Sequence, residues 1–132
     1  PAPAAGVDIK DPAVRFGALM HRGKVQIRRG RFESALEAYT AALELRPNAA
    51  GANLGQANAL MELERYEEAE TAVNVALEKR PRNVNAYLLL ATILRQRGDD
   101  DQARWAYDRI FRIDTKSKAA RAARQALAEM GP

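Results

Sequence analysis

The sequence predicts an all-α protein built from stacked helix pairs, and three observations carry this prediction. The chain repeats itself every 34 residues, because "ALELRPN" at residues 42–48 is followed by "ALEKRPR" at 76–82. Apolar residues within each copy recur three and four positions apart, the spacing of one face of a helix. Small residues occupy matching positions in successive copies, where they let two helix backbones approach closely. A period of this length is typical of a solenoid whose repeats bury their faces against one another.

The repeat becomes clear when the chain is aligned on Pro47 and Pro81, with Thr115 in the equivalent place of a third copy. Small residues then share columns, and larger apolar residues fill the columns beside them. The small columns are Gly23, Ala57 and Ala91, then Ala35, Ala69 and Ala103, and then Ala42 and Ala76, where Ile110 completes the set; the larger ones are Tyr39, Val73 and Tyr107, and Leu43, Leu77 and Phe111.

Two helices are expected in each copy, the first pair at about 14–29 and 32–45. Gly30 and Gly98 stand where a helix needs a residue that tolerates positive φ to close its last turn. The second copy has Glu64 there, so we expect a tighter or differently closed turn at that point. This pattern divides the chain into repeats at about 16–49, 50–83 and 84–115.

Helix starts carry their own signals. Asp11 before Pro12 predicts an N-cap followed by proline at the first helical position. Asp99 predicts the start of the sixth helix in the same way, with acids in the first turn that favour the helix dipole. A seventh helix at about 117–130 has one apolar stripe and is otherwise polar or basic, which predicts a cap on the open end of the stack. The stripe is Ala120, Ala123, Leu127 and Met130.

Composition favours a single globular domain. The chain has 132 residues, 47% of them hydrophobic and 29% charged, with a net charge of +4 and no cysteine. No apolar run approaches the length of a membrane span. The segment 1–11 begins "PAPAAG" and is interpreted as a Pro/Ala-rich linker from a longer protein or as a flexible N-terminus, and residues 12–132 are expected to form the single domain. Alanine- and arginine-rich usage suggests a bacterial source, and such a linker suits a cytoplasmic or a periplasmic domain.

The 34-residue period and its columns resemble the tetratricopeptide repeat over roughly residues 14–130. The family's early tryptophan is replaced by Leu19, Asn53 and Tyr87. The resemblance implies about seven helices in a right-handed superhelix whose concave groove is lined by the first helix of each pair. It also implies an adaptor that binds protein partners, as extended or helical peptides in that groove. The family's signature positions are filled by Gly23, Phe32, Ala35, Tyr39, Ala42 and Pro47, by Ala57, Tyr66, Ala69, Ala76 and Pro81, and by Ala91, Gly98, Ala103 and Tyr107.

The implied register predicts a peptide-binding set on the groove face. Met20, Leu54 and Leu88 share one column and are expected to form an apolar strip, with an alternative role in sealing the helix interfaces. Gly51 and Gly55 are expected to open space for a bulky side chain of the partner. Basic residues around the strip favour a partner with apolar anchors and acidic residues. The predicted set is Met20, His21, Lys24, Arg28, Leu54, Asn58, Met61, Asn85, Leu88, Thr92 and Arg95.

One branch of the family grips the acidic C-terminus of heat-shock chaperones with a clamp of lysine, asparagine, asparagine, lysine and arginine. The matching positions in this chain differ in kind at every point, so the sequence argues against chaperone-tail binding. They are Met20, Lys24, Gly55, Asn85 and Leu89.

Nothing in the sequence predicts an enzyme, a cofactor or a metal site. His21 is the only histidine and has no carboxylate beside it in sequence, so it is interpreted as a groove or surface residue. No phosphate loop, nucleophile elbow or metal-ligand pair is present.

Two other functions compete with peptide binding. Trp105 aligns with Glu37 and Thr71 on the expected convex side, where it would either anchor self-association or lie against the capping helix, and we favour the latter. Nucleic-acid binding is the weaker alternative: residues 15–31 carry basic residues without an acid, but the interleaved aromatics of single-strand binders are missing.

Overall fold

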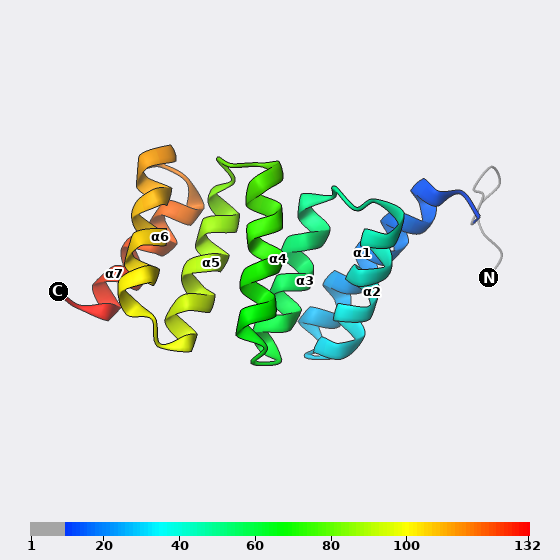
Figure 1. Cartoon of the computed structure of the whole chain (residues 1–132), viewed down its shortest axis with the longest axis horizontal. Coiled ribbons are helices and arrows are strands. Elements are labelled where there is room, and N and C mark those ends of the chain that lie inside the picture. Colours follow the sequence, from blue (N-terminus) through cyan, green and yellow to red (C-terminus); the bar gives the residue numbers. More distant parts are fainter. Residues whose placement is uncertain (1–9) are drawn as a thin grey trace.

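The computed structural model describes residues 10–132, so the expected linker at 1–11 lies almost wholly outside the described residues. Within that range the chain forms seven α-helices and no strand, which confirms the all-α prediction (Figure 1). The helices are α1 Pro12–Arg28, α2 Phe32–Leu45, α3 Ala50–Glu62, α4 Tyr66–Lys79, α5 Val84–Arg97, α6 Asp100–Ile113 and α7 Lys118–Met130.

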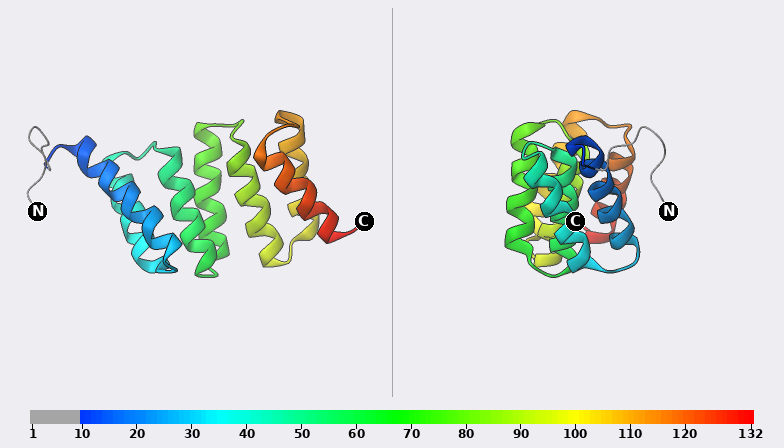
Figure 2. Two further views of the ribbon diagram at one scale, coloured as in Figure 1. Left: turned by 180° about the vertical axis from the view of Figure 1, so that it is seen from behind. Right: turned by 90° about the vertical axis from the view of Figure 1, so that its right-hand side faces the viewer.

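The helices form two layers that run the length of an elongated stack, with α1 at one end and α7 at the other (Figures 1 and 2). We call α1, α3, α5 and α7 the inner layer, and α2, α4 and α6 the outer layer. Neighbouring inner helices contact one another, whereas among the described residues the outer helices contact only inner ones. The inner side of the stack is therefore the shorter, more tightly packed side, as a curved solenoid requires.

The small-residue columns are the places where helices cross. Ala35, Ala69 and Ala103 have no exposed surface, and the same holds for Ala57 and Ala91. A larger residue in any of these places would push two backbones apart, because the interior is packed at crystal-like density. The period read from the sequence is thus the period of helix packing.

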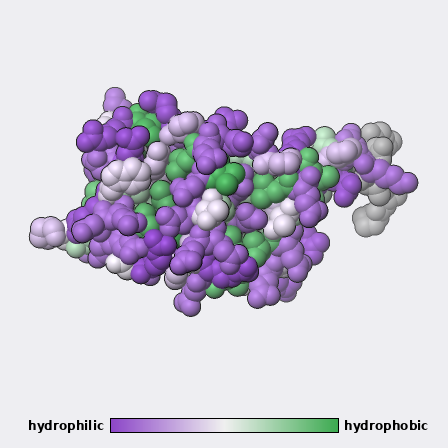
Figure 3. Space-filling view, viewed as in Figure 1, coloured by the Kyte–Doolittle hydropathy of each residue, from purple (hydrophilic) through white to green (hydrophobic). Residues whose placement is uncertain are grey.

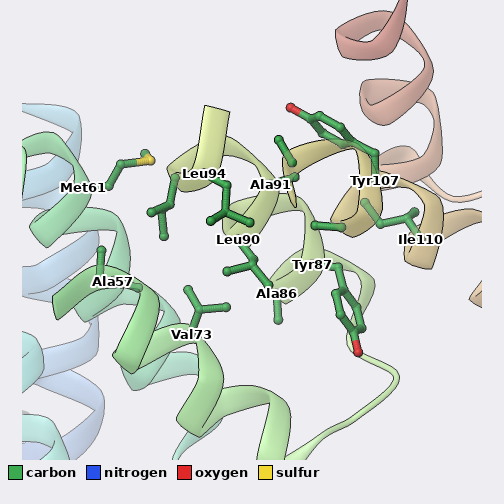
Figure 4. Close-up of a cluster of buried hydrophobic side chains, with 14 of the residues drawn as sticks. Ala57, Met61, Val73, Ala86, Tyr87, Leu90, Ala91, Leu94, Tyr107 and Ile110 are labelled. Atoms are coloured by element: carbon green, nitrogen blue, oxygen red, sulfur yellow. The ribbon is translucent and has the colours of Figure 1, made fainter. Parts of the chain in front are cut away.

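One continuous apolar core runs from α3 to α7, and Figure 4 shows part of it. Val73, Ile93 and Ile110 are the largest side chains that are fully buried in it. A smaller cluster around Tyr39 joins α1, α2 and α3. Arg97 adds a polar tie between α4 and the α5–α6 turn, since it donates to Glu70 at 2.8 Å and to Asp99 at 2.6 Å.

The α1–α2, α3–α4 and α5–α6 turns are closed in the same way. Gly30, Glu64 and Gly98 have φ values of +73°, +60° and +93°. The residue after each donates a backbone hydrogen bond to a carbonyl five positions earlier, as in Arg31 to Gln26 and Arg65 to Leu60. The expectation of a different turn at Glu64 was therefore wrong. The glutamate takes the left-handed conformation because packing of α3 on α4 fixes the turn.

Side-chain caps hold three of the helix starts. The Asp11 carboxylate accepts from the Ala13 N–H at 2.8 Å, and Ser117 and Asn83 accept from the N–H three residues on. Asp99 does stand at the N-cap of α6, but its side chain makes no capping bond and accepts from Arg97 instead. The predicted N-cap at Asp11 is confirmed, including its capping hydrogen bond. For Asp99 the position is confirmed, but the capping hydrogen bond is missing.

The two ends of the stack differ. At the C-terminal end α7 packs on α5 and α6 and buries Ala119, Ala120 and Ala123. At the N-terminal end the outward face of α1 is open, with Val14 36% exposed and Ala18 exposed. Ala52 and Ala86, which take the place of Ala18 in the next two repeats, are fully buried.

Candidate functional site

All eleven residues of the predicted binding set lie on the inner helices α1, α3 and α5. Met20, Leu54 and Leu88 supply one half-buried apolar side chain from each of these helices. His21, Lys24, Arg28 and Asn85 are exposed, whereas Asn58, Thr92 and Arg95 are half-buried. The inner face therefore presents a line of apolar side chains with polar and basic ones beside it.

Met61 does not belong to this face. Its side chain is only 6% exposed and belongs to the apolar core, where Figure 4 shows it on the side of Leu94. We therefore remove Met61 from the candidate set. The sequence suggested otherwise because a methionine near the end of an inner helix fits either surface.

The two glycines of α3 have different roles. A Cβ on Gly55 would collide with the ring of Tyr39, which reaches from α2 into the space beside this glycine and Gly23. Gly55 is therefore needed for packing and opens no room for a partner, contrary to expectation. A Cβ on Gly51 would meet only the Cε of Met20, at 3.6 Å, which is ordinary contact. Of these two glycines, Gly51 is the one that leaves unoccupied space on the inner face.

The C-terminal half of the inner face is a hollow of about 550 Å³ between α5 and α7. Arg95 lies in it and donates to the Glu129 carboxylate of α7 at 3.2 Å, a hydrogen bond that raises the pKa of the guanidinium above its ordinary value. Thr92 donates its hydroxyl hydrogen to the Leu88 carbonyl at 2.8 Å. The positive charge predicted for this half is thus paired within the chain.

The N-terminal half holds a second hollow, of about 630 Å³, between the start of α1 and the start of α3. Phe16, Met20 and Gly51 line it, and Arg46 and Arg80 reach it from the two loops that connect the repeats. The Arg46 guanidinium carbon lies 4.4 Å from the centre of the Phe16 ring, a cation–π contact. This half of the inner face keeps its positive charge.

The sequence reasoning overlooked Phe16, Arg46, Arg80 and Glu129. A signal for the two arginines was present, because each directly precedes the proline that marks a repeat, in "LRPN" and "KRPR". The proline marks the end of each repeat, and the arginine before it lies at the same place in both loops. No comparable signal marks Glu129, since its partner Arg95 is 34 residues away.

The chain is similar in sequence and in structure to known repeat proteins. A sequence model of the tetratricopeptide repeat matches residues 20–81 and again 54–118, which together span most of the chain. The chain belongs to the tetratricopeptide-repeat family. A search of curated proteins found no match. The repeat is a protein-interaction scaffold, and the inner face described above is the side that the family resemblance assigns to the groove.

Three solved tetratricopeptide-repeat structures illustrate the likeness. The domain of Arabidopsis OM64 has a TM-score of 0.79 at 21% identity, covering 90% of this chain and 98% of that one. The TPR2B domain of yeast Sti1, in complex with pHsp70, has a TM-score of 0.79 at 26% identity, covering 84% and 91%. The second domain of human RPAP3, in complex with the HSP70 peptide SGPTIEEVD, has a TM-score of 0.76 at 21% identity, covering 87% and 96%.

Trp105 lies on the outer side of this tetratricopeptide-repeat domain and is 55% exposed. Its ring meets Tyr87 of α5 edge-on at 6.3 Å, and it borders a hollow of about 380 Å³ between α4 and α6. The favoured expectation that Trp105 lies against the capping helix was therefore wrong, since its ring contact is to α5. Figure 3 shows the side of the outer helices, where hydrophilic residues predominate and smaller hydrophobic patches lie between them.

Other kinds of site find no support in the described part of the chain. Residues 10–132 contain no group of three side chains that could hold a metal ion. None of the helices described is both long and apolar enough to cross a membrane.

Proposed function

We propose that the domain is an adaptor whose inner face binds a partner protein through an extended or helical peptide with apolar anchors and acidic residues. The observation that carries the proposal is the strip of Met20, Leu54 and Leu88. Each side chain is half-buried, so each is held in place by the core and still offers apolar surface to a ligand. We assign no catalytic step to the domain.

The solved relatives support this kind of ligand. The RPAP3 and Sti1 domains named above are complexes with Hsp70 segments, and the printed RPAP3 peptide ends in the acidic sequence EEVD. We infer that this chain takes such a peptide on its inner face. Its inner helices carry exposed basic residues, Lys24 and Arg28, on a helix that contains no acid.

The way an acidic peptide is held must differ from the chaperone clamp. Gly55 stands where the clamp has an asparagine, and the Tyr39 ring leaves no room for any side chain there. Met20 and Leu89 stand where the clamp has cations. The proposed partner is therefore an acidic peptide that is recognised by apolar anchoring first, and not by capture of its C-terminal carboxylate.

The test is capture from a native lysate by the wild type and by a Leu54→Glu/Leu88→Glu variant, each shown by circular dichroism to be folded. A Thr71→Glu/Asn74→Glu variant is the matched control, because it adds the same charge at exposed positions of the outer helix α4. We expect the groove variant to lose the partner and the control to keep it. Loss by the control alone would move binding to the outer face.

A second candidate function is self-association through the outer hollow, and the exposure of Trp105 favours it. An exposed tryptophan beside a hollow is typical of an interface anchor. Sedimentation over a hundredfold range of concentration would show a mass that rises in the wild type and stays constant in a Trp105→Ala variant. A constant monomer mass in both proteins would dismiss this candidate.

A further inference from the structure

We propose that the N-terminal hollow is a subsite for an apolar side chain that stands next to a carboxylate in the bound peptide. The hollow is the one between α1 and α3, lined by Phe16, Met20, Gly51, Arg46 and Arg80. The inference rests on the proposed function and deepens it, since it names the chemistry of the ligand and the end of the groove where its acidic part lies.

The floor of the subsite is apolar and open. Phe16 and Met20 are both half-buried, so their surfaces are fixed by packing and still accessible. Gly51 is exposed between them and the loop, and only Met20 Cε lies near the place of a missing Cβ. A hollow of about 630 Å³ bounded in this way has room for a leucine- or phenylalanine-sized side chain.

The rim of the subsite is cationic. Arg46 and Arg80 are exposed and occupy equivalent positions of successive repeats. They enter the hollow from the α2–α3 loop and the α4–α5 loop. Among the described residues, 10–132, no acidic side chain lines the hollow. Stacking of Arg46 on Phe16 orients its planar guanidinium, and the edge of the plane keeps its N–H donors for a carboxylate. The rim therefore complements an anion that adjoins the apolar anchor.

The opposite end of the inner face shows why the acidic part of the ligand should lie here. Arg95 is the arginine that lines the C-terminal hollow, and Glu129 of the same hollow already pairs with it. A partner carboxylate there would have to displace an existing ion pair. At the N-terminal hollow it would meet two arginines, and none of the described lining residues is an acid that competes for them.

The probes are the acid acetyl-Phe-Asp-NH2, in which an apolar side chain adjoins a side-chain carboxylate and the C-terminus is uncharged, and the amide acetyl-Phe-Asn-NH2, its uncharged counterpart. Each is titrated into the isotope-labelled full chain while the amide signals of Gly51 and Ala52 and the methyl signal of Met20 are followed by NMR. We expect the acid to shift these signals at concentrations roughly three to ten times lower than the amide, the combined contribution of two exposed ion pairs. Added salt should remove the difference, since it screens exposed charges.

Two variants locate the interaction. Arg46→Gln/Arg80→Gln should bind acid and amide equally, whereas Arg31→Gln/Arg121→Gln, which removes the same charge at exposed positions outside the hollow, should keep the preference. Gly51→Leu should abolish both titrations by filling the floor. Equal binding of the two probes to the wild type, or shifts confined to other residues, would overturn the proposal.

The two proposals can fail separately. If the acid binds at Gly51 while the Leu54→Glu/Leu88→Glu variant still captures its partner, the subsite stands and the groove function falls. If capture depends on Leu54 and Leu88 but the probes show no preference, the groove stands and the carboxylate subsite falls.

Discussion

The ring of Tyr39, carried by the outer helix α2, occupies the space that a side chain at position 55 of the inner helix α3 would need. The same ring lies over Gly23 of α1, where a Cβ would come within 2.5 Å of it. One aromatic residue thus holds three helices together, and two glycines make room for it. This arrangement fixes the packing of the first repeat. It also prevents position 55 from carrying a polar side chain into the groove.

Gly55→Ala should destabilise the fold, because the added methyl forces the Tyr39 ring to move. Overpacking of this kind costs about 1–3 kcal/mol. Gly51→Ala is the matched control on the same helix, and it should be neutral or stabilising by up to about 1 kcal/mol, the gain in helix propensity. Urea unfolding followed by circular dichroism measures both changes. Equal midpoints for the two variants would mean that the ring is free to shift.

Tyr39 should also govern stability in alkali. Burial raises the pKa of its phenol above the ordinary value of 10.0, because the charged form loses hydration. The neutral phenol therefore favours the folded state: its contribution is complete below the unfolded pKa and is lost as the pH rises through the folded pKa. Above pH 10 the wild type should lose stability more steeply than Tyr39→Phe, by up to about 1.4 kcal/mol per pH unit. Urea midpoints between pH 8 and 11 test this, and parallel curves would contradict it.

Arg97→Gln should cost more than the loss of an ordinary surface ion pair. Arg97 is 28% exposed and joins Glu70 and Asp99, which belong to different elements. We expect a loss of about 1–2 kcal/mol, since charged hydrogen bonds that are partly shielded from water are stronger than exposed ones. Arg112→Gln removes an exposed pair with Asp108, 68% and 56% exposed, and should cost less than about 0.5 kcal/mol.

A double-mutant cycle with Glu70→Gln separates the pair from other effects of Arg97. The coupling free energy should be favourable and should shrink in high salt. A coupling energy indistinguishable from zero would show that Arg97 acts only through packing of its aliphatic stem.

Ser117→Ala should loosen α7 before it affects the rest of the chain. The Ser117 hydroxyl accepts from the Ala120 N–H at 3.0 Å, and loss of such a cap costs about 1 kcal/mol. Because α5 and α6 are the helices of residues 10–132 that α7 contacts, its amides should exchange with solvent faster while those of α3 keep their protection. Ser117→Asp retains an acceptor and should restore the slow exchange. Faster exchange throughout the chain would contradict this local effect.

The periodic part of the sequence predicted the fold because each column corresponds to one packing contact. Ala35 and Ala69 could be placed from the sequence, since a fully buried small residue recurs wherever two helices cross. Turn chemistry was harder to predict at Glu64. There the tertiary packing of α3 on α4 imposes a left-handed residue that local preference alone would not choose.

The candidate site was less predictable because its character depends on contacts between distant segments. The sequence alone does not distinguish the charge of Arg95 from that of Arg46. In the structure Glu129 of α7 forms an ion pair with Arg95, whereas Arg46 stacks on the ring of Phe16. Gly55 and Gly51 are one turn apart on the same helix, and only the reach of Tyr39 distinguishes them. Such differences arise from contacts between side chains that are far apart in the sequence. The repeat period therefore does not predict them.

The two ends of the stack differ in how readily they would accept an additional helix pair. A further helix pair grafted ahead of α1 would find a face shaped like those of α3 and α5, because Ala18 stands in the place of Ala52 and Ala86. A pair grafted after α7 would meet a helix whose exposed residues include Lys118, Arg121, Arg124 and Glu129. Duplication of a repeat within the gene is therefore tolerated more readily upstream, and a designer who lengthens this domain should build from the amino-terminal side.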